Sequence, residues 1–264
     1  MTTIEAILLG LLQGFTEFLP VSSSGHLEIG KEILGVTVAE DSQLTFSVLV
    51  HCATVLATIT IFAREIWGLI CGGLKFRYNA ETQYLLKIAL SMIPVGVVGV
   101  FFKDEVESLF GGSIYIVGAM LLVTAALLTF SHFFVPRKSH PVTYRDSFII
   151  GLAQAFAVLP GVSRSGSTIA TGLMLGVDRK LLAKFSFLMV LVPILGETFL
   201  ELIGGKFSPE ASGIPTVALV AGFLAAYFSG LIACQAMIKI VSKGKLYYFA
   251  IYCAILAMVI FIFG

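Results

Sequence analysis

Residues 13–26 of this chain read QGFTEFLPVSSSGH, and residues 154–167 read QAFAVLPGVSRSGS. Placed over each other at an offset of 141 residues, the stretches share Gln13/Gln154, Phe15/Phe156, Val21/Val162, Ser22/Ser163, Ser24/Ser165 and Gly25/Gly166. Glu17 and His26 occur only in the first copy, and Arg164 occurs only in the second. Acid, imidazole and guanidinium are thus divided between two copies of one polar loop. This division predicts a composite active site.

The composition indicates an integral membrane protein. Hydrophobic residues make up 58% of the 264 residues and charged residues 12%, whereas a soluble domain carries about 25% charged residues. Such a chain has too few polar side chains to cover a surface that faces water. The net charge of +1 gives no reason to expect a nucleic acid as partner. The 4 cysteines include no CxxC pair that would indicate a zinc or redox site.

The lengths of the apolar segments predict an all-α polytopic fold. A membrane-spanning helix needs about 20 mostly apolar residues. Six segments meet this length, and we expect each to be a transmembrane helix: roughly 44–62, 85–102, 114–135, 184–204, 214–238 and 246–263. The N-terminal segment lacks a basic region and a small-residue cleavage site, so we expect it to belong to the mature protein.

Two shorter apolar pieces fall below this length. They cover residues 5–20 and 148–160, and each leads through a repeated polar loop into a second short piece, 27–35 or 168–177. Irregular backbone at membrane depth is tolerated only where protein or a water-filled cavity satisfies it. We therefore predict two re-entrant helical hairpins whose polar tips meet near the middle of the membrane.

The repeat extends beyond the two loops. Residues 46–50 read FSVLV and open the first predicted span, and residues 185–189 read FSFLM and open the fourth. Repeat 1 would cover about residues 1–135 and repeat 2 about 145–264, within a single membrane domain. Each repeat holds one hairpin and three spans. Because three is odd, the second repeat enters the membrane with opposite polarity, an arrangement familiar from secondary transporters.

Basic residues predict the orientation, because Lys and Arg are enriched in cytoplasmic loops. The predicted cytoplasmic side carries Arg64, Lys75, Arg77, Lys87, Arg137, Lys138, Arg145, Arg179, Lys180, Lys184, Lys239, Lys243 and Lys245. The opposite side carries only Lys31, Lys103 and Lys206, with an excess of acidic residues. Both termini are therefore expected on the outer side.

Glu17 is the first candidate for chemistry. It follows Gln13 by four residues, so both side chains lie on one face of a helix. A carboxylate within a membrane segment is costly and is by default a candidate functional residue. The alternative is an interfacial glutamate exposed to water. Pro20 and the polar loop that follow directly place Glu17 at a turn and favour the functional interpretation.

The loop Ser22, Ser23, Ser24, Gly25 and His26 is the second candidate. Hydroxyls and free amides at a helix N-terminus form a natural anion site, and the alternative is an ordinary helix cap. Glycine lets the backbone approach a ligand closely. His26 is the residue of this loop that can exchange a proton near neutral pH.

The second copy supplies Arg164. A guanidinium offers forked donors that match phosphate oxygens, although an arginine can also extend to the membrane interface. Flanking hydroxyls and amides favour a phosphate site, and the flanking residues are Ser163, Ser165, Gly166, Ser167 and Thr168.

Several other residues are weaker candidates. His51 lies inside the first span, and the sequence is compatible with either a structural role or a proton-carrying role for it. Glu197 and Glu201, one helical turn apart, are expected beside the site or in a lid. Gly68, Gly72 and Gly118 are predicted to allow close packing of helices.

The motifs at 13–26 and 160–168 resemble those of the bacterial undecaprenyl-diphosphatase family of the bacitracin-resistance type, and the resemblance covers the whole chain. It implies an enzyme that removes one phosphate from undecaprenyl diphosphate, regenerating the lipid carrier of peptidoglycan synthesis. It also implies a divalent cation and a site open to the outer face of the bacterial inner membrane. The working set carried over to this chain is Gln13, Glu17, Ser23, His26 and Arg164. Many members have Glu where this chain has Gln13, which puts in doubt any mechanism that needs two carboxylates there.

The expected mechanism follows from these residues. Arg164 and the amides of both hairpin tips would bind the diphosphate, and Glu17 with phosphate oxygens would hold Mg²⁺ or Ca²⁺. His26 is the favoured nucleophile or acid–base group. Ser23 is the alternative nucleophile, with His26 or Glu17 as its base, and water activated by Glu17 is a third option.

The rival interpretation is an inverted-repeat transporter or lipid flippase, since the repeat and the broken helices are transporter architecture. The asymmetric acid, imidazole and guanidinium set favours catalysis, because binding alone needs no such set. A purely structural scaffold would leave the repeated polar loops unexplained. The expected partners are the isoprenoid diphosphate substrate, membrane lipid and a second copy of the chain in a homodimer.

Overall fold

The computed structural model describes residues 1–36, 40–102, 105–106, 108, 113–134, 136, 138–203 and 213–263. Within these ranges the chain is helical and contains no β-strand, apart from an isolated bridge between His140 and Val177. The helices are α1 (Thr3–Phe18), α2 (Ser23–Leu34), α3 (Glu40–Ile61), α4 (Ala63–Gly73), α5 (Ala80–Phe101), α7 (Ile114–Phe133), α8 (Tyr144–Phe156), α9 (Arg164–Met174), α10 (Arg179–Met189), α11 (Leu191–Ile203), α13 (Thr216–Ser242) and α14 (Tyr247–Phe263). The predicted all-α class is confirmed for the described residues.

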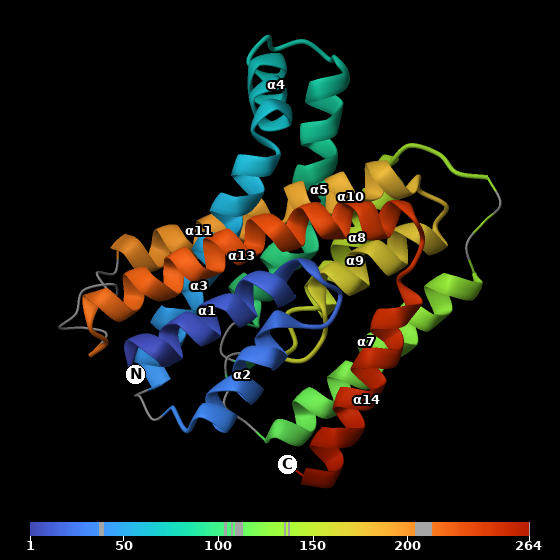
Figure 1. Cartoon of the computed structure of the whole chain (residues 1–264). Coiled ribbons are helices and arrows are strands. Elements are labelled where there is room, and N and C mark those ends of the chain that lie inside the picture. The colour runs from blue at the N-terminus through green and yellow to red at the C-terminus, as the bar shows by residue number, and fades with distance from the viewer. Residues whose placement is uncertain are drawn as a thin grey trace.

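Both predicted hairpins are present as helix–turn–helix pairs, α1/α2 and α8/α9 (Figure 1). Each pair begins with a capping box, in which a threonine and an acidic side chain satisfy each other's backbone amides. The residues are Thr2 with Glu5 in α1 and Thr143 with Asp146 in α8. These four residues also lie 141 positions apart in pairs, so the repeat reaches back to the start of each hairpin.

Four described helices are long and apolar enough to cross a membrane: Leu44–Ile61 of α3, α5, α7 and α13. They correspond to the first, second, third and fifth predicted spans. The sixth predicted span is α14, a shorter apolar helix of 17 residues. The fold is thus that of a polytopic helical membrane protein.

The fourth predicted span, residues 184–204, is not one helix, so this prediction was wrong. α10 ends at Met189, and α11 begins at Leu191. Pro193 lies in the first turn of α11, and it has no amide hydrogen to donate to the carbonyl of Met189. The missing hydrogen bond weakens the helix at this point, which is where the break between α10 and α11 lies.

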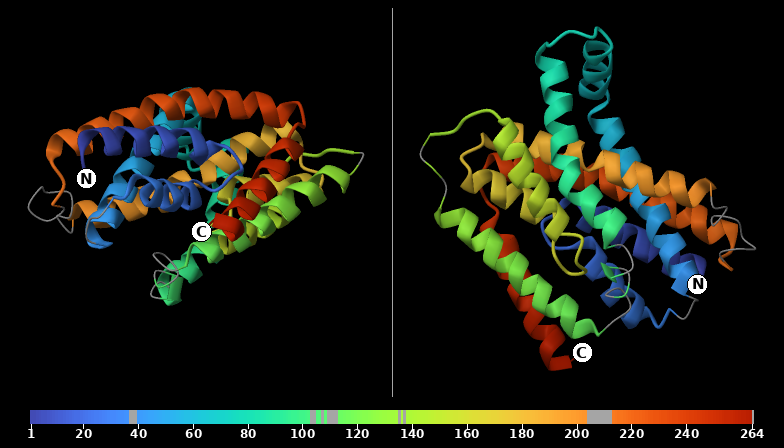
Figure 2. Two further views of the ribbon diagram at one scale, coloured as in Figure 1. Left: turned by 60° about the horizontal axis from the view of Figure 1, so that its bottom comes forward. Right: turned by 180° about the vertical axis from the view of Figure 1, so that it is seen from behind.

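A separate helix, α4, follows the first predicted span and was not among the six predicted spans. This helix continues the chain beyond α3 and projects, together with the first part of α5, from the rest of the molecule (Figures 1 and 2). Trp67, Phe76 and Tyr78 are exposed on this projection.

Small residues set the closest helix contacts. A Cβ added at Gly10 of α1 would lie 2.3 Å from the carbonyl oxygen of Gly222 in α13. A Cβ added at Gly151 of α8 would lie 2.4 Å from the carbonyl oxygen of Ser91 in α5. Helices in membranes use such glycines to bring backbones together. Each hairpin therefore packs closely against a long helix from the other half of the chain.

Of the glycines predicted to allow close helix packing, two have a neighbouring side chain close by in the structure and one does not. Gly72 faces the side chain of Glu81, and Gly118 faces Ile260. Gly68 has open space beside it, so its predicted packing role was wrong.

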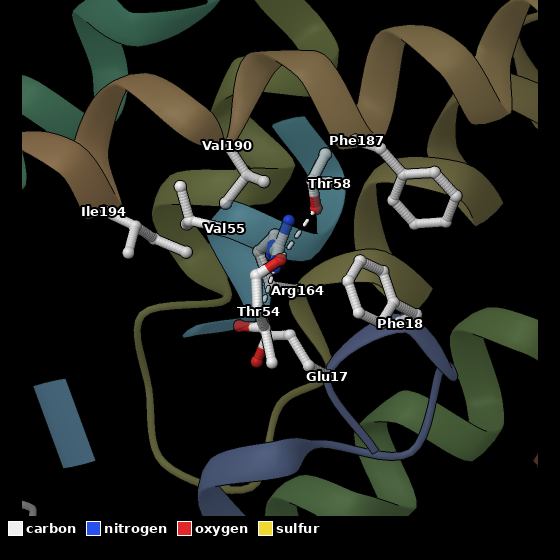
Figure 3. Close-up of a pocket in the computed structure, with 9 residues that line it drawn as sticks. All are labelled: Glu17, Phe18, Thr54, Val55, Thr58, Arg164, Phe187, Val190 and Ile194. Carbon is white, nitrogen blue, oxygen red and sulfur yellow. Dashed lines mark hydrogen bonds and ion pairs between the residues drawn. The ribbon is translucent and has the colours of Figure 1, made fainter. Parts of the chain in front are cut away.

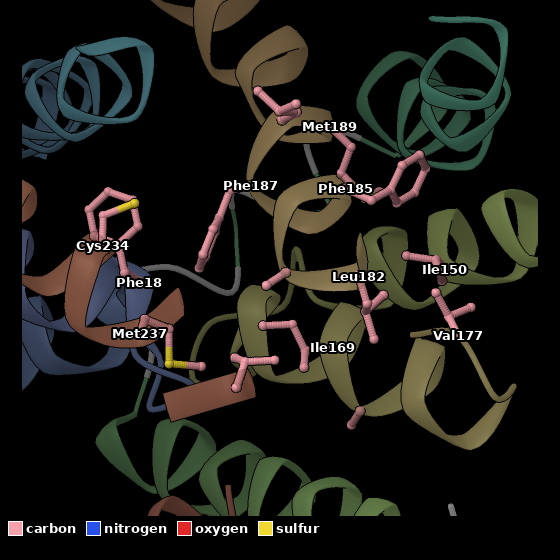
Figure 4. Packing of buried hydrophobic residues seen from close by; sticks show 14 of the residues in the cluster. Phe18, Ile150, Ile169, Val177, Leu182, Phe185, Phe187, Met189, Cys234 and Met237 are labelled. Carbon is pink, nitrogen blue, oxygen red and sulfur yellow. The ribbon is translucent and has the colours of Figure 1, made fainter. Parts of the chain in front are cut away.

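The largest cluster of buried apolar side chains surrounds α10 (Figure 4). Phe187 of α10 meets Phe18, the last residue of α1, edge to face at 5.7 Å between ring centroids. This contact brings the end of the first hairpin helix next to the break between α10 and α11.

Candidate active site

Glu17 lies in the last turn of α1 and is buried, with 7% of its surface exposed. Gln13, one turn earlier, donates from Nε2 to Glu17 Oε2 at 2.9 Å. The Ser23 hydroxyl donates to the same oxygen at 2.6 Å. The short connection between α1 and α2 makes this possible, because it folds the first residue of α2 back onto the last turn of α1. The predicted pair on one helix face and the predicted serine are thus brought together.

Arg164, the first residue of α9, completes this cluster. Its Nη2 donates to Glu17 Oε1 in an ion pair between the two hairpins. Ser23 and Arg164 occupy aligned positions of the repeat, 141 residues apart. Each is the first residue of its second hairpin helix, and each bonds one carboxylate oxygen of Glu17.

A pocket adjoins this ion pair (Figure 3). Its wall comes from the C-terminal end of α1, from α3, from the start of α9, and from both sides of the break between α10 and α11. The lining residues are Glu17, Phe18, Thr54, Val55, Thr58, Arg164, Phe187, Val190 and Ile194. Apart from the Glu17–Arg164 pair and two threonines, this lining is apolar, so charge in the pocket interacts strongly with that pair.

Two polar atoms beside the ion pair are buried and have no hydrogen-bond partner among the described residues: Gln13 Oε1 and Arg164 Nη1. Buried polar groups in native proteins are nearly always satisfied, so an orphaned acceptor and an orphaned donor point to a ligand. The amide oxygen suits a hard cation, and the guanidinium nitrogen suits a phosphate oxygen.

His26, the predicted proton-exchanging residue of the first loop, makes its contacts with other groups. It lies in the first turn of α2 and is buried, and both of its ring nitrogens contact groups other than Glu17 and Arg164. Nδ1 lies 2.8 Å from the carbonyl oxygen of Ser22, and Nε2 lies 2.7 Å from the hydroxyl of Tyr252 in α14. Sequence reasoning missed Tyr252, because nothing in an apolar C-terminal helix links it to residue 26.

The remaining residues of the two loops mainly shape the turns. Ser22 Oγ accepts from the amide of Gly25 at 3.3 Å, and Ser163 Oγ accepts from the amide of Gly166 at 3.0 Å. Both serines therefore act as helix caps, the alternative that the sequence had left open. Ser24 lies 3.3 Å from the Ser22 hydroxyl.

Two residues of the second loop reach beyond their own turn. The Ser165 hydroxyl donates to the carbonyl oxygen of Leu19 at 3.1 Å and so joins the two hairpins. The Thr168 hydroxyl lies 2.6 Å from that of Ser186 in α10. The first contact ties α9 to the end of the first hairpin helix, and the second ties α9 to α10.

His51 of α3 lies closer to the cluster than the sequence could show. Nε2 is 3.5 Å from Glu17 Oε2, and Nδ1 is 2.7 Å from the carbonyl oxygen of Ser47. In the sequence, the sign that His51 belongs near a functional site was its position inside an apolar predicted span. Glu197 and Glu201 belong to α11, but their side chains lie outside the described part of the chain.

Long apolar helices around two hairpins, with a carboxylate, a hydroxyl and a guanidinium held together inside, define a helical membrane protein with an internal site suited to phosphoryl chemistry. The chain belongs to the family of the bacitracin resistance protein BacA, whose model matches residues 6–259. The family predicted from the motifs is thereby confirmed.

Named relatives agree with this assignment. The undecaprenyl-diphosphatase of Bacteroides fragilis is 56% identical over 262 residues, 98% of this chain and 97% of that protein. The undecaprenyl-diphosphatase of Bacteroides thetaiotaomicron is 54% identical over 263 residues, 99% of each chain. That of Christiangramia forsetii is 48% identical over 264 residues, 100% of this chain and 99% of its own.

Proposed function

We propose that this protein hydrolyses undecaprenyl diphosphate to undecaprenyl phosphate and inorganic phosphate at the Glu17–Ser23–Arg164 cluster. The family and the names of the full-length relatives support the activity. The observation that carries the site is the Ser23 hydroxyl, 2.6 Å from a buried carboxylate whose other oxygen faces Arg164. The rival transporter or flippase function is not favoured by these relatives.

Ser23 is the nucleophile that this geometry supports best. Its Oγ–H bond breaks as the proton passes to Glu17 Oε2, and Oγ bonds to the terminal phosphorus. The bond from that phosphorus to the bridging oxygen breaks, and undecaprenyl phosphate leaves with the electron pair. Glu17 passes the Ser23 proton to the departing undecaprenyl phosphate and becomes a base again. Water then attacks the phosphorus of the phosphoserine while its proton passes to Glu17, the P–Oγ bond breaks, phosphate is released, and Ser23 Oγ takes the proton back from Glu17. We prefer this order to the sequence-based choice of His26 as nucleophile, since both ring nitrogens of His26 are engaged by Ser22 and Tyr252.

Arg164 would bind the diphosphate through Nη1, the nitrogen that has no partner among the described residues. Charge develops on the phosphoryl oxygens during transfer, and a fixed guanidinium stabilises it. The amides of Gly25 and Gly166 are less available to the diphosphate, because they already donate to the Oγ atoms of Ser22 and Ser163.

The predicted divalent cation fits the residues present. Gln13 Oε1 is a buried oxygen without a partner in the described structure and lies beside Glu17. No group of three or more His, Cys, Asp or Glu that could hold a metal occurs among the described residues. One oxygen from Gln13 and one from Glu17 would suit Mg²⁺ or Ca²⁺, with phosphate and water oxygens completing the shell. Gln13 and Glu17 would hold the ion, which when bound neutralises charge on the diphosphate.

We further propose that the two hairpins are re-entrant, that the chain crosses the bacterial inner membrane six times, and that the termini and the site face outward. The broken helix α10/α11 would then count as one crossing. Single cysteines in a chain without its native cysteines test this orientation. An impermeant maleimide added to intact cells should label Ser108→Cys and spare Lys75→Cys, and the reverse pattern would refute the orientation.

The test of function is phosphate release from undecaprenyl diphosphate by the purified protein in detergent. The wild-type chain should release phosphate and lose this activity on EDTA treatment, with recovery on adding Mg²⁺ or Ca²⁺. Ser23→Ala and Arg164→Lys should each lower kcat by about 10²- to 10³-fold. A protein that only moves lipid would release no phosphate. Light scattering of the same sample would test the predicted homodimer.

The covalent step has its own test. Rapid quenching of a reaction with substrate labelled in its terminal phosphate should trap label on the wild-type protein and none on Ser23→Ala. Label that survives in Ser23→Ala and disappears in His26→Gln would assign the nucleophile to His26 instead.

A further inference from the structure

His26 is held by the last helix of the protein. Its buried ring lies nearly parallel to that of Tyr252, with 12° between the planes and 5.7 Å between the centroids. The Tyr252 oxygen lies 2.7 Å from His26 Nε2, across 226 residues of sequence. Tyr252 is thus the side chain that joins α14 to the imidazole in the first polar loop.

The two contacts of the ring fix its tautomer. The carbonyl oxygen of Ser22 can only accept, so His26 Nδ1, 2.8 Å away, carries the hydrogen. In the neutral ring Nε2 then has a lone pair, and the Tyr252 hydroxyl donates to it. Removing that hydroxyl would leave a buried acceptor unsatisfied and free the ring to change its orientation or tautomer.

The neighbouring contacts of α14 support a positioning role. Cys253 is fully buried, and its thiol donates to the carbonyl oxygen of Pro20 at 3.6 Å. Val21 packs in the same apolar cluster as Cys253 and Ala257. α14 therefore contacts both the turn before α2 and His26 in the first turn of α2.

We propose that Tyr252 is a positioning residue of the active site: by donating to Nε2 it keeps His26 in the Nδ1–H tautomer, whose hydrogen bond to the Ser22 carbonyl oxygen holds the turn that carries Ser23. This inference rests on the proposed function, in which Ser23, carried by the turn that His26 contacts, is the nucleophile. Tyr252 acts through His26 and does not itself touch the reacting atoms.

The test compares Tyr252→Phe with Tyr248→Phe, which removes the same group from an exposed position one turn away on α14. Phosphate release should show kcat about tenfold lower in Tyr252→Phe, as for the loss of one hydrogen bond, with KM within about twofold of wild type. Tyr248→Phe should match the wild type in both constants. An unchanged kcat in Tyr252→Phe, or a raised KM with a lower Tm, would overturn the proposal.

Nitrogen NMR provides a readout that does not depend on activity. The chain has only 4 histidines, so ¹⁵N-histidine labelling gives few signals, and His26→Asn assigns those of His26. Wild-type protein should show a single Nδ1–H tautomer at His26, and Tyr252→Phe should show exchange between tautomers. An unchanged spectrum in Tyr252→Phe would also overturn the proposal. If the wild-type protein releases no phosphate, the proposed function fails, whereas the spectra still report whether Tyr252 fixes His26.

Discussion

The two hairpins share one backbone plan and differ in the side chains that it carries. Both begin with a capping box, and both start their second helix at a serine cap, Ser22 or Ser163. Yet the position aligned with Glu17 is Val158, and the position aligned with Ser23 is Arg164. One hairpin supplies the carboxylate and the hydroxyl, and the other supplies the guanidinium. A symmetric scaffold thus builds an asymmetric site, because both second helices begin beside the same carboxylate.

The two turns also differ in backbone conformation. Ser22 has φ +67°, in the region that side chains other than glycine rarely adopt, whereas Ser163 has φ −75°. The second turn places its positive φ, +93°, at Gly161 instead. Strain at a residue other than glycine is concentrated at functional sites. The strained turn is here the one that carries Ser23 and His26.

The largest expected effect comes from removing the charge that the hairpins share. Glu17→Gln keeps the shape but leaves Arg164 without its counter-ion and Ser23 without a base. We expect kcat for phosphate release to fall by about 10²- to 10⁴-fold. The aligned change Val158→Ala should leave kcat within about twofold of wild type. Comparable losses in both variants would mean that the hairpins divide the chemistry in some other way.

The packing of the two hairpins should be equally intolerant of added volume. Gly10→Ala and Gly151→Ala each place a methyl group within 2.4 Å of a backbone oxygen. We expect each to lower the free energy of unfolding by about 1–3 kcal/mol. Gly99→Ala on α5, where nothing lies within 4 Å, is the control and should be neutral or stabilising. Unfolding in mixed detergent micelles measures the stability of all three variants. If only one of Gly10→Ala and Gly151→Ala were destabilised, the two hairpins would not be packed equally tightly.

The backbone difference between the turns predicts a smaller contrast. Ser163→Gly loses a cap and gains flexibility, which should lower the free energy of unfolding by about 1 kcal/mol. Ser22→Gly has the same losses but relieves the positive φ, so we expect a change within about 0.5 kcal/mol. Thermal unfolding of the two variants in one detergent gives the comparison. Equal destabilisation would show that Ser22 is not strained.

The smallest expected effect concerns a contact that only the second hairpin has. His140, in the connection before α8, has Nδ1 2.9 Å from the carbonyl oxygen of Pro141 and Nε2 3.1 Å from that of Leu175. The pKa of His140 is raised above its ordinary value, mainly by the hydrogen bond to the Pro141 carbonyl. The hydrogen bond to the Leu175 carbonyl and the nearby Asp146 carboxylate raise it further. The doubly protonated ring can donate to both carbonyls at once.

Because the folded pKa is raised, this stabilisation is complete below about pH 6.5 and is lost as the pH rises through the folded value. Wild-type Tm should therefore fall slightly between pH 6 and 8 relative to that of His140→Asn, measured in parallel. Parallel curves of Tm against pH for the two proteins would show that protonated His140 does not stabilise the fold.

The sequence indicated the hairpins because their signals are local. Apolar length, the repeated SxSG motif and the positions of Glu17 and Arg164 are all present within short windows. The broken fourth span was missed even though Pro193 was visible, because total apolar length outweighed a single proline. The packing glycines were misassigned in part, since Gly68 and Gly10 look alike until their neighbours are known.

By itself the sequence determined an apolar helical chain, its duplication and the unequal division of acid, hydroxyl, imidazole and guanidinium between the copies. These properties follow from composition and from periods of a few residues. Only the tertiary structure decided which groups meet: Arg164 with Glu17, His51 beside them, and His26 turned to Tyr252. Such contacts join residues from different helices, and they depend on how each helix is rotated and packed. No local pattern specifies that rotation, because it results from side chains and glycines of all the helices packing together.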